Sequence, residues 1–317
     1  MCLVALALDE SRRFPFVVAA NRDEFFARPA NRLAWWTPTE GGPEILGGRD
    51  LSAGGTWMGL TAAGRFALVT NVRRPATLDP EAPSRGGIVP GWLRTEMRPD
   101  QFWMQTSLSG YAPFNLIAAD FRRGDCFWAT SEQALPHRIE RGIFGLSNAA
   151  LDTPWPKVRA LKGRMAEALK DADSVDMLAE RLFASLADET PAADDDLPST
   201  GVARDVERML SSAFIRSPDG RYGTRCSTLV ITERVRRQLV THVFERTYGD
   251  ESGVPQLRRA RLADWPPRYA DGAFGPAEVS AVSESVLGVV ETVGESPELA
   301  ERRTRHRTLL RPARRTA

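Results

Sequence analysis

The stretch MCLVALALDESRRFPFVVAANRDEFF, residues 1–26, contains two short apolar runs separated by a polar connection. The runs at 3–8 and 16–20 predict two β-strands, and DESRRFP between them predicts a hairpin loop. The chain therefore begins with an antiparallel strand pair, and the rest of the fold is built outward from this hairpin.

The register of the predicted hairpin determines which residues lie beside the N-terminus. If Ala7 lies opposite Phe16, Cys2 faces Asn21 to within about two residues. The polar run Asn21-Arg22-Asp23-Glu24 then emerges next to Cys2, where the second strand ends. The hairpin thus predicts a thiol and a charged cluster at one end of a sheet.

The remaining sequence is typical of strands, then helices, then strands again. This order differs from the alternating βαβ rhythm of a parallel fold and predicts an α+β sandwich, with helices covering antiparallel sheets. The further strands are expected at 56–60, 66–72, 114–119, 126–129, 143–146, 224–232 and 238–245, and helices at 155–171, 175–187 and 202–215.

The sequence changes character after residue 248. Residues 249–317 include six prolines and end in the arginine-rich run RRTRHRTLLRPARRTA. We expect one domain over 1–248 and a weakly structured, Pro/Arg-rich extension over 249–317, with a possible helix at 278–293. The basic end could contact nucleic acid, but such a tail is more often simply solvated, so we predict no specific nucleic-acid partner.

Composition bounds the class of protein. The 317 residues are 42% hydrophobic and 26% charged, with a formal net charge of +1, as in a soluble globular protein. The three cysteines and three histidines form no metal-ligand spacing, so we predict neither a metal site nor a disulfide framework. No signal peptide or membrane span is apparent, and the expected location is the cytoplasm, without a membrane anchor.

Cys2 directly follows the initiator methionine. Removal of Met1 would leave a cysteine whose free α-amine has an ordinary pKa near 8 and can accept the thiol proton. One residue would then supply both nucleophile and base. The alternative is a poorly constrained chain end with no chemical role.

Polar side chains near Cys2 fit this chemistry. Arg22 can stabilise a thiolate, and Asp23 can orient the α-amine. An ordinary solvated loop with an incidental ion pair is the competing interpretation.

Three further residues lie at strand ends or starts. Asn71 and Asn148 end strands, where their amides can donate to a developing oxyanion or simply form turns. Arg225 precedes a strand and can bind a carboxylate, or serve as an edge charge. Cys126 and Cys226 are in apolar strand contexts and are predicted to be packed thiols.

Several ordered motifs together resemble the NRDE family, whose eukaryotic members are called transport and Golgi organisation 2 proteins. The matching strings are Met1-Cys2, AANRDEF, GGTWMGLTAAGRFALVTNVR, PSRGGIV, GLSNA and YGTRCSTLV, in order over residues 1–248. The resemblance implies a four-layer αββα sandwich of the N-terminal-nucleophile hydrolase type, similar to the penicillin V acylase and bile salt hydrolase group.

The resemblance also implies roles for individual residues. Cys2 would be nucleophile and base, Arg22 and Asp23 its polar support, and Asn148 and Asn71 oxyanion or substrate contacts, with Asn21 and Arg225 as binding residues. In the acylases the Arg and Asp lie three residues apart, whereas Arg22 and Asp23 are adjacent.

Two functions follow as expectations. The first is an amidohydrolase or acyl transferase that acts on a small non-peptide amide and needs no cofactor. The alternative is a binding or trafficking protein that uses the same cleft for haem or an acylated metabolite.

Overall fold

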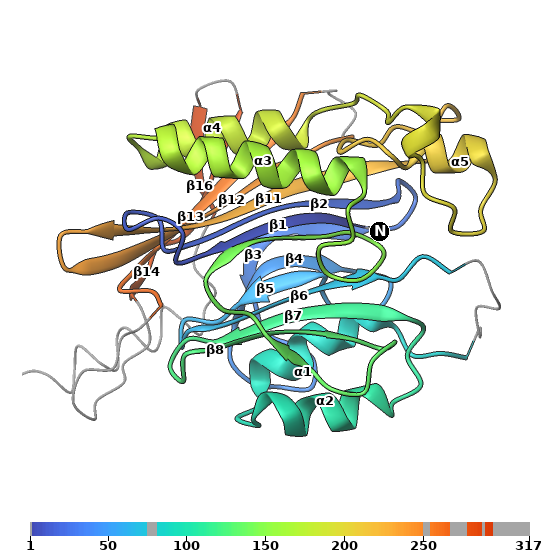
Figure 1. Cartoon of the computed structure of the whole chain (residues 1–317). Helices are drawn as coiled ribbons and strands as arrows, with labels where there is room; N and C mark the ends of the chain where they lie inside the picture. The colour runs from blue at the N-terminus through green and yellow to red at the C-terminus, as the bar shows by residue number, and fades with distance from the viewer. Residues whose placement is uncertain (1, 75–80, 250–253, 267–277, 287–288, 294–317) are drawn as a thin grey trace, which may run out of the picture.

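Two antiparallel β-sheets pack face to face, and helices cover both outer faces (Figure 1). The computed structural model describes residues 2–74, 81–249, 254–266, 278–286 and 289–293. Within these residues the larger sheet has nine strands and the smaller sheet has seven. The α+β class and the four-layer αββα arrangement predicted above are confirmed.

The helices and strands have the following bounds. The larger sheet runs in the order β10 (Gly142–Leu146), β1 (Cys2–Leu8), β2 (Phe16–Phe25), β11 (Tyr222–Val235), β12 (Gln238–Thr247), β13 (Gln256–Ala263), β15 (Val282–Val286) and β16 (Val289–Val293), with β14 (Glu278–Val279) paired to β13. The smaller sheet runs β3 (Ala30–Trp36), β4 (Ile45–Asp50), β5 (Met58–Leu60), β6 (Arg65–Asn71), β7 (Phe114–Asp120), β8 (Asp125–Thr130) and β9 (His137–Arg138). The helices are α1 (Ile88–Arg94), α2 (Pro99–Ser107), α3 (Pro156–Asp171), α4 (Val175–Leu186) and α5 (Arg204–Met209).

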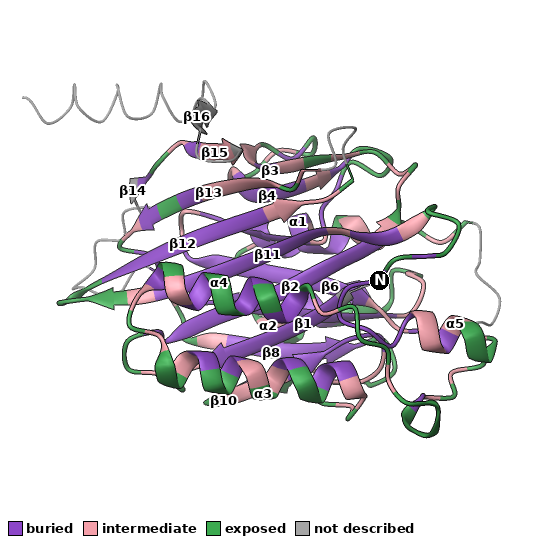
Figure 2. Cartoon of the chain, turned by 90° about the horizontal axis from the view of Figure 1, so that it is seen from above, coloured by how far each residue is buried: buried purple, intermediate pink, exposed green. Residues whose placement is uncertain are grey.

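Apolar side chains form three layers. One lies between the sheets and includes Phe16 and Phe66, another lies under α3 and α4, and the third lies under α1 and α2. Helices α3 and α4 are amphipathic: each buries one side on the larger sheet and exposes the other (Figure 2). Strand residues therefore alternate between the inter-sheet core and the helix-facing core.

The first hairpin forms with a register one residue from the expected one. Leu8, rather than Ala7, lies opposite Phe16, because the Asp9 N–H donates to the Pro15 carbonyl at 2.7 Å and closes a loop over residues 9–15. The difference lies within the tolerance of the prediction. It matters nonetheless, because a slip of one residue exchanges the two faces of a strand.

The segment after residue 248 differs from the expected extension. β13 pairs with Val240–Thr247 of β12, and β14, β15 and β16 lie within 278–293, where the sequence predicted a helix. Valine is frequent in this segment, and β-branched residues favour the pleated surface of a sheet over a helix. This part of the chain thus extends the larger sheet.

Trp265 ties the same segment to the core. Its side chain is fully buried, its Nε1 donates to the Thr61 carbonyl at 2.8 Å, and its ring packs edge-on against Phe121. The described part of 254–293 is therefore integral to the sandwich.

One predicted helix is shorter than expected. The prediction covered residues 202–215, but α5 covers only Arg204–Met209. The hydroxyl of Ser211 donates to the Arg208 carbonyl and that of Ser212 to the Phe214 carbonyl, so side chains take over from the helical pattern. No helix in the described residues has the length and apolar character that a bilayer crossing requires.

Candidate functional site

The site predicted around Cys2 lies at the end of β1 where the chain enters the larger sheet (Figure 1). Cys2 pairs with Arg22 on β2, and Arg22 in turn pairs with Cys226 on β11. Residues opposite one another on neighbouring strands share a face of the sheet. Position 2, Arg22 and Cys226 therefore occupy one row across three strands, and the side chains of Arg22 and Cys226 face the smaller sheet.

Arg22 and Asp23 point to opposite faces of β2 because successive residues in a strand alternate. The Arg22 guanidinium lies between the sheets, 3.3 Å from Asp50 and 4.4 Å from the centre of the Trp57 indole ring. Asp23 is on the helix-facing side, where it accepts a 2.6 Å hydrogen bond from Thr224 Oγ1. The two residues lie close to position 2 from different sides of the sheet.

Asp50 anchors Arg22 in its position. Arg28 Nε donates to Asp50 Oδ2 at 2.6 Å, and the backbone N–H groups of Ser52 and Ala53 donate to Oδ1. Burial opposes ionisation of Asp50, but these hydrogen bonds outweigh burial and lower its pKa below the ordinary value. Asp50 is thus a fixed negative charge shared by two arginines.

The indole ring of Trp57 packs against the guanidinium of Arg22. The ring rests on Gly48, where an added Cβ would lie 2.3 Å from the indole carbon Cη2. A side chain at position 48 would displace the ring, so this glycine is needed for close approach. The GGRD motif therefore supplies both the space for Trp57 and the carboxylate of Asp50.

Asp23 is more deeply buried than Asp50, which makes its ionisation less favourable. It is fully buried, and desolvation raises its pKa, while Lys157 on α3 is the strongest influence in the opposite direction. Lys157 is itself only 5% exposed, and its Nζ donates to the Leu210 carbonyl at 2.8 Å. The side chains of Asp23 and Lys157 are thus buried together behind β2.

The structure brings Asn71 and Asn148 together at the same end of the sandwich. Asn148 Nδ2 donates to the Asn71 carbonyl at 2.8 Å, and Ser147 Oγ donates to Asn148 Oδ1 at 3.2 Å. The pairing of β1 with β10 advances residue for residue up to Val4 opposite Leu146. Asn148 follows two residues beyond this last pair, after β10 has ended at Leu146.

Asn21 has all its hydrogen-bonding groups committed within the protein. Its Nδ2 donates to the carbonyls of Leu186 and Ala213, both at 2.8 Å, and its Oδ1 accepts from Ser227 Oγ at 2.6 Å. Because the side chain faces the helices, it fixes β2 to that layer. This geometry favours a structural role over the predicted binding role.

Arg225 occupies a β-bulge beside the NRDE strand. The pairing of β11 with β2 shifts between Thr224 and Cys226, which leaves Arg225 as the extra residue. Its Nη1 donates to the carbonyls of Phe25 and Arg28, and its buried Nε has no hydrogen-bond partner within the described residues. Desolvation, followed by repulsion from Arg22, lowers the pKa of Arg225.

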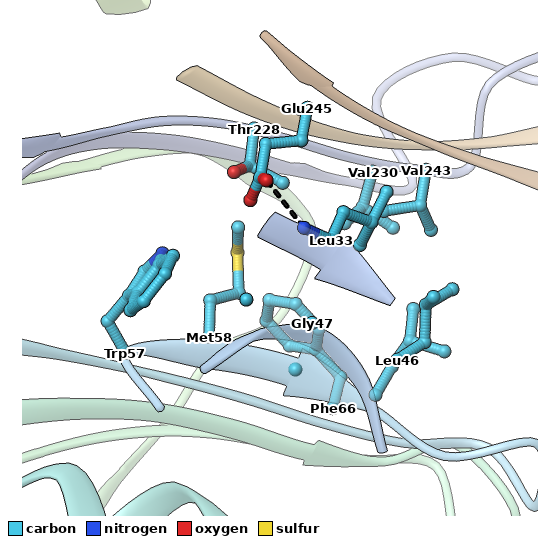
Figure 3. Close-up of a pocket in the computed structure, with 13 residues that line it drawn as sticks. Leu33, Leu46, Gly47, Trp57, Met58, Phe66, Thr228, Val230, Val243 and Glu245 are labelled. Carbon is cyan, nitrogen blue, oxygen red and sulfur yellow. Dashed lines mark hydrogen bonds between the residues drawn. The ribbon is translucent and has the colours of Figure 1, made fainter. Parts of the chain in front are cut away.

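A small cavity of about 10 Å³ lies between the sheets (Figure 3), and a second cavity of the same size is lined in part by Arg22. Trp57, Met58 and Thr228 border both cavities. A volume near 10 Å³ is about that of one water probe, far less than a drug-sized ligand needs.

The described residues contain two histidines, His137 and His242. No group of three or more His, Cys, Asp or Glu side chains in this part of the chain could hold a metal ion. His137 is exposed on β9, and His242 is hydrogen-bonded to Arg259 and stacks on Phe244 in the helix-facing layer. Neither histidine lines the two cavities described above.

Comparison with known proteins places this geometry in a family. Residues 1–250 match the family described as "Transport and Golgi organisation 2". The chain belongs to this family. A Bos taurus member, "Transport and Golgi organization protein 2 homolog", is 33% identical over 251 residues, which cover 74% of this chain and 89% of that protein. The Homo sapiens protein of the same name is 32% identical over 253 residues, with the same coverage.

Among solved structures, the chain is similar to a conjugated bile acid hydrolase of Clostridium perfringens, crystallised as its C2A mutant. That alignment has a TM-score of 0.43 and 10% identity, and it covers 93% of this chain and 100% of that chain. The pairing of its own strands defines the fold of this transport and Golgi organisation 2 member.

Several residues near the family's NRDE strand were not identified from the sequence. Arg73 Nη1 contacts Glu207 Oε2 at 2.6 Å, and both side chains are buried near Lys157 and Asp23. Lys157 lies four residues before Leu161, on the apolar face of α3. A charged residue on that face could have indicated a buried charge from the sequence. The partners of Arg73 are distant in sequence, so no local pattern indicates this pair.

Proposed function

We propose that this protein is an N-terminal cysteine amidohydrolase, or a related acyl transferase, that acts on a small non-peptide amide. The observation that carries the proposal is the register of the first hairpin, which sets position 2 directly opposite Arg22. A guanidinium in this place favours the thiolate form of a neighbouring cysteine.

The proposed reaction begins after loss of Met1. The α-amine of Cys2 takes the thiol proton, and the sulfur attacks the amide carbonyl carbon to give a tetrahedral oxyanion. Collapse of this intermediate breaks the C–N bond, and the ammonium returns its proton to the leaving amine. The remaining thioester is cleaved by water in a hydrolase, or by an incoming amine or alcohol in a transferase.

Asp23 is the proposed partner of the α-amine. Cys2 begins β1 opposite Arg22, and Asp23 is the next residue along β2, so the α-amine left by loss of Met1 would lie near Asp23. Burial raises the pKa of Asp23, and Lys157 opposes that effect; in either protonation state a carboxyl oxygen of Asp23 can accept a hydrogen bond from the α-amine.

Asn148 is the proposed oxyanion donor. A primary amide has two N–H groups, and one of them is already held by the Asn71 carbonyl. The second N–H can therefore donate in a preset direction, which is what an oxyanion site requires. Asn71 positions Asn148, and Arg225 is proposed to bind an anionic part of the substrate.

The test is the mass of the purified protein followed by labelling with an electrophilic acyl or haloacetamide probe. We expect loss of Met1 and stoichiometric labelling on the N-terminal peptide. Cys2→Ala should abolish this labelling, whereas Cys226→Ala is the matched control in the same row and should keep it. Retained Met1, or labelling that survives Cys2→Ala, would contradict the proposal.

A further inference from the structure

A second row of side chains lies next to the row that contains position 2 and Arg22. Following the pairing across the larger sheet, Ala20 lies opposite Thr228, Thr228 opposite Glu245, and Glu245 opposite Arg258. These residues face the smaller sheet, and Figure 3 shows Glu245 and Thr228 together on one wall of the inter-sheet cavity, above Trp57 and Met58.

Glu245 reaches across the gap between the sheets. Its Oε1 accepts a 2.6 Å hydrogen bond from the Leu33 N–H on β3 of the smaller sheet (Figure 3). The side chain is 1% exposed and is the single charged group among the residues that line this cavity. A buried carboxyl in an apolar wall is costly unless its charge is balanced.

Charged groups approach Glu245 from four elements. The arginines are Arg22 on β2, Arg32 on β3 and Arg258 on β13, and each of them favours ionisation of Glu245. Glu284 on β15 already holds two of these arginines, with Arg32 and Arg258 both at 2.9 Å. Arg22 is held by Asp50 but shares that carboxylate with Arg28. Glu245 is therefore the additional carboxyl that can offset the charge of Arg22.

We propose that Glu245 is a positioning residue for the Cys2 site. When Glu245 is ionised it weakens the stabilisation of the Cys2 thiolate by Arg22, and when Glu245 is neutral that stabilisation acts in full. This inference deepens the proposed function and rests on it. Desolvation raises the pKa of Glu245 to about 7, which supports a change of charge near neutral pH.

The expected size of the effect follows from the sheet geometry. Position 2 and Glu245 are separated by three strand spacings of about 4.8 Å and two residues of about 3.4 Å, or roughly 16 Å. At an effective dielectric constant of about 20 to 40, one charge at this distance changes the thiolate fraction about two- to six-fold.

The experiment measures the alkylation rate of Cys2 by iodoacetamide, followed on the N-terminal peptide by mass spectrometry from pH 5.5 to 9. Glu245→Gln keeps the side-chain shape and the acceptor for the Leu33 N–H but removes the charge. We expect this variant to react about two- to six-fold faster than the wild type above pH 7 and at the same rate near pH 5.5. Glu233→Gln, at the far end of β11, is the matched control and should follow the wild type.

The outcomes separate the inference from the proposed function. Superimposable profiles for Glu245→Gln and wild type, with a reactive Cys2, would overturn the role of Glu245 alone. A rate difference of the same size at every pH would also overturn it, because a purely structural effect does not follow ionisation. If Cys2 reacts no faster than a cysteine in a short peptide at any pH, the proposed function falls, and the inference falls with it.

Discussion

The buried carboxyl of Glu245 predicts a measurable loss of stability as pH rises. Burial raises the pKa of Glu245 from 4.5 to about 7, so folding favours the protonated form. Its contribution to the free energy of unfolding is fully present below pH 4.5 and is lost as pH rises through about 7. The difference between these two pKa values corresponds to about 3 kcal/mol, since a tenfold change in a protonation equilibrium is worth about 1.4 kcal/mol.

His242 acts in the opposite direction over nearly the same range. Burial, assisted by Arg259 and Arg261, lowers the pKa of His242 from 6.5 to about 4. Its stabilising contribution is present above pH 6.5 and is lost as pH falls through about 4, again about 3 kcal/mol. In the wild type the pH dependences of the unfolding free energy from Glu245 and His242 have opposite signs. The total can therefore be flat between pH 4.5 and 7 although both contributions are present.

Substitution separates the two contributions. We expect the difference in unfolding free energy between wild type and Glu245→Gln to decrease by about 3 kcal/mol from pH 4.5 to pH 8, measured by urea unfolding with tryptophan fluorescence. For His242→Gln the same difference should increase by about 3 kcal/mol from pH 4 to pH 7. A difference for Glu245→Gln that stays constant within about 1 kcal/mol would refute the reasoning.

Two further substitutions, each with an exposed control, test the burial of an aromatic ring and of an ion pair. Trp265→Ala should lower the unfolding free energy by about 3–5 kcal/mol because the ring is fully buried, whereas Leu108→Ala, at an 83% exposed position, should change it by less than about 0.5 kcal/mol in the same urea titration. Glu207→Ala leaves the Arg73 guanidinium buried without its carboxylate and should cost about 3–5 kcal/mol, while Glu189→Ala, in an exposed pair, should cost less than about 1 kcal/mol; equal losses for the two would contradict a buried ion pair.

The first hairpin and several strands and helices were predicted from the sequence because their signals are local. Alternating apolar runs predicted β1, β2, β11 and β12, and the apolar spacing predicted α3 and α4. The register was off by one residue because the hydrogen bond that closes the loop, from Asp9 to Pro15, depends on backbone geometry that a pattern of residue types does not specify.

Register reasoning predicted that Arg22 and Asp23 lie near position 2, because strand pairing connects residues through simple numbering, whereas Asn148 was proposed from its place at a strand end. Asp50, Glu245 and Lys157 were not foreseen, since each comes from an element that reaches the site only through packing of separate layers. The valines after residue 278 show the limit of periodicity, because their β-branched preference outweighed an apparent helical spacing.

The strands that follow the family match have a consequence for shortened versions of this protein. A chain cut at residue 250 would lose β13, and Val240–Thr247 of β12 would become a free sheet margin with unpaired amide and carbonyl groups. Removing Trp265 at the same time would leave the aromatic cluster of Phe16 and Phe121 without its cover. Such a fragment would recruit a second copy along that margin, so its behaviour in solution would report on self-association rather than on the native molecule.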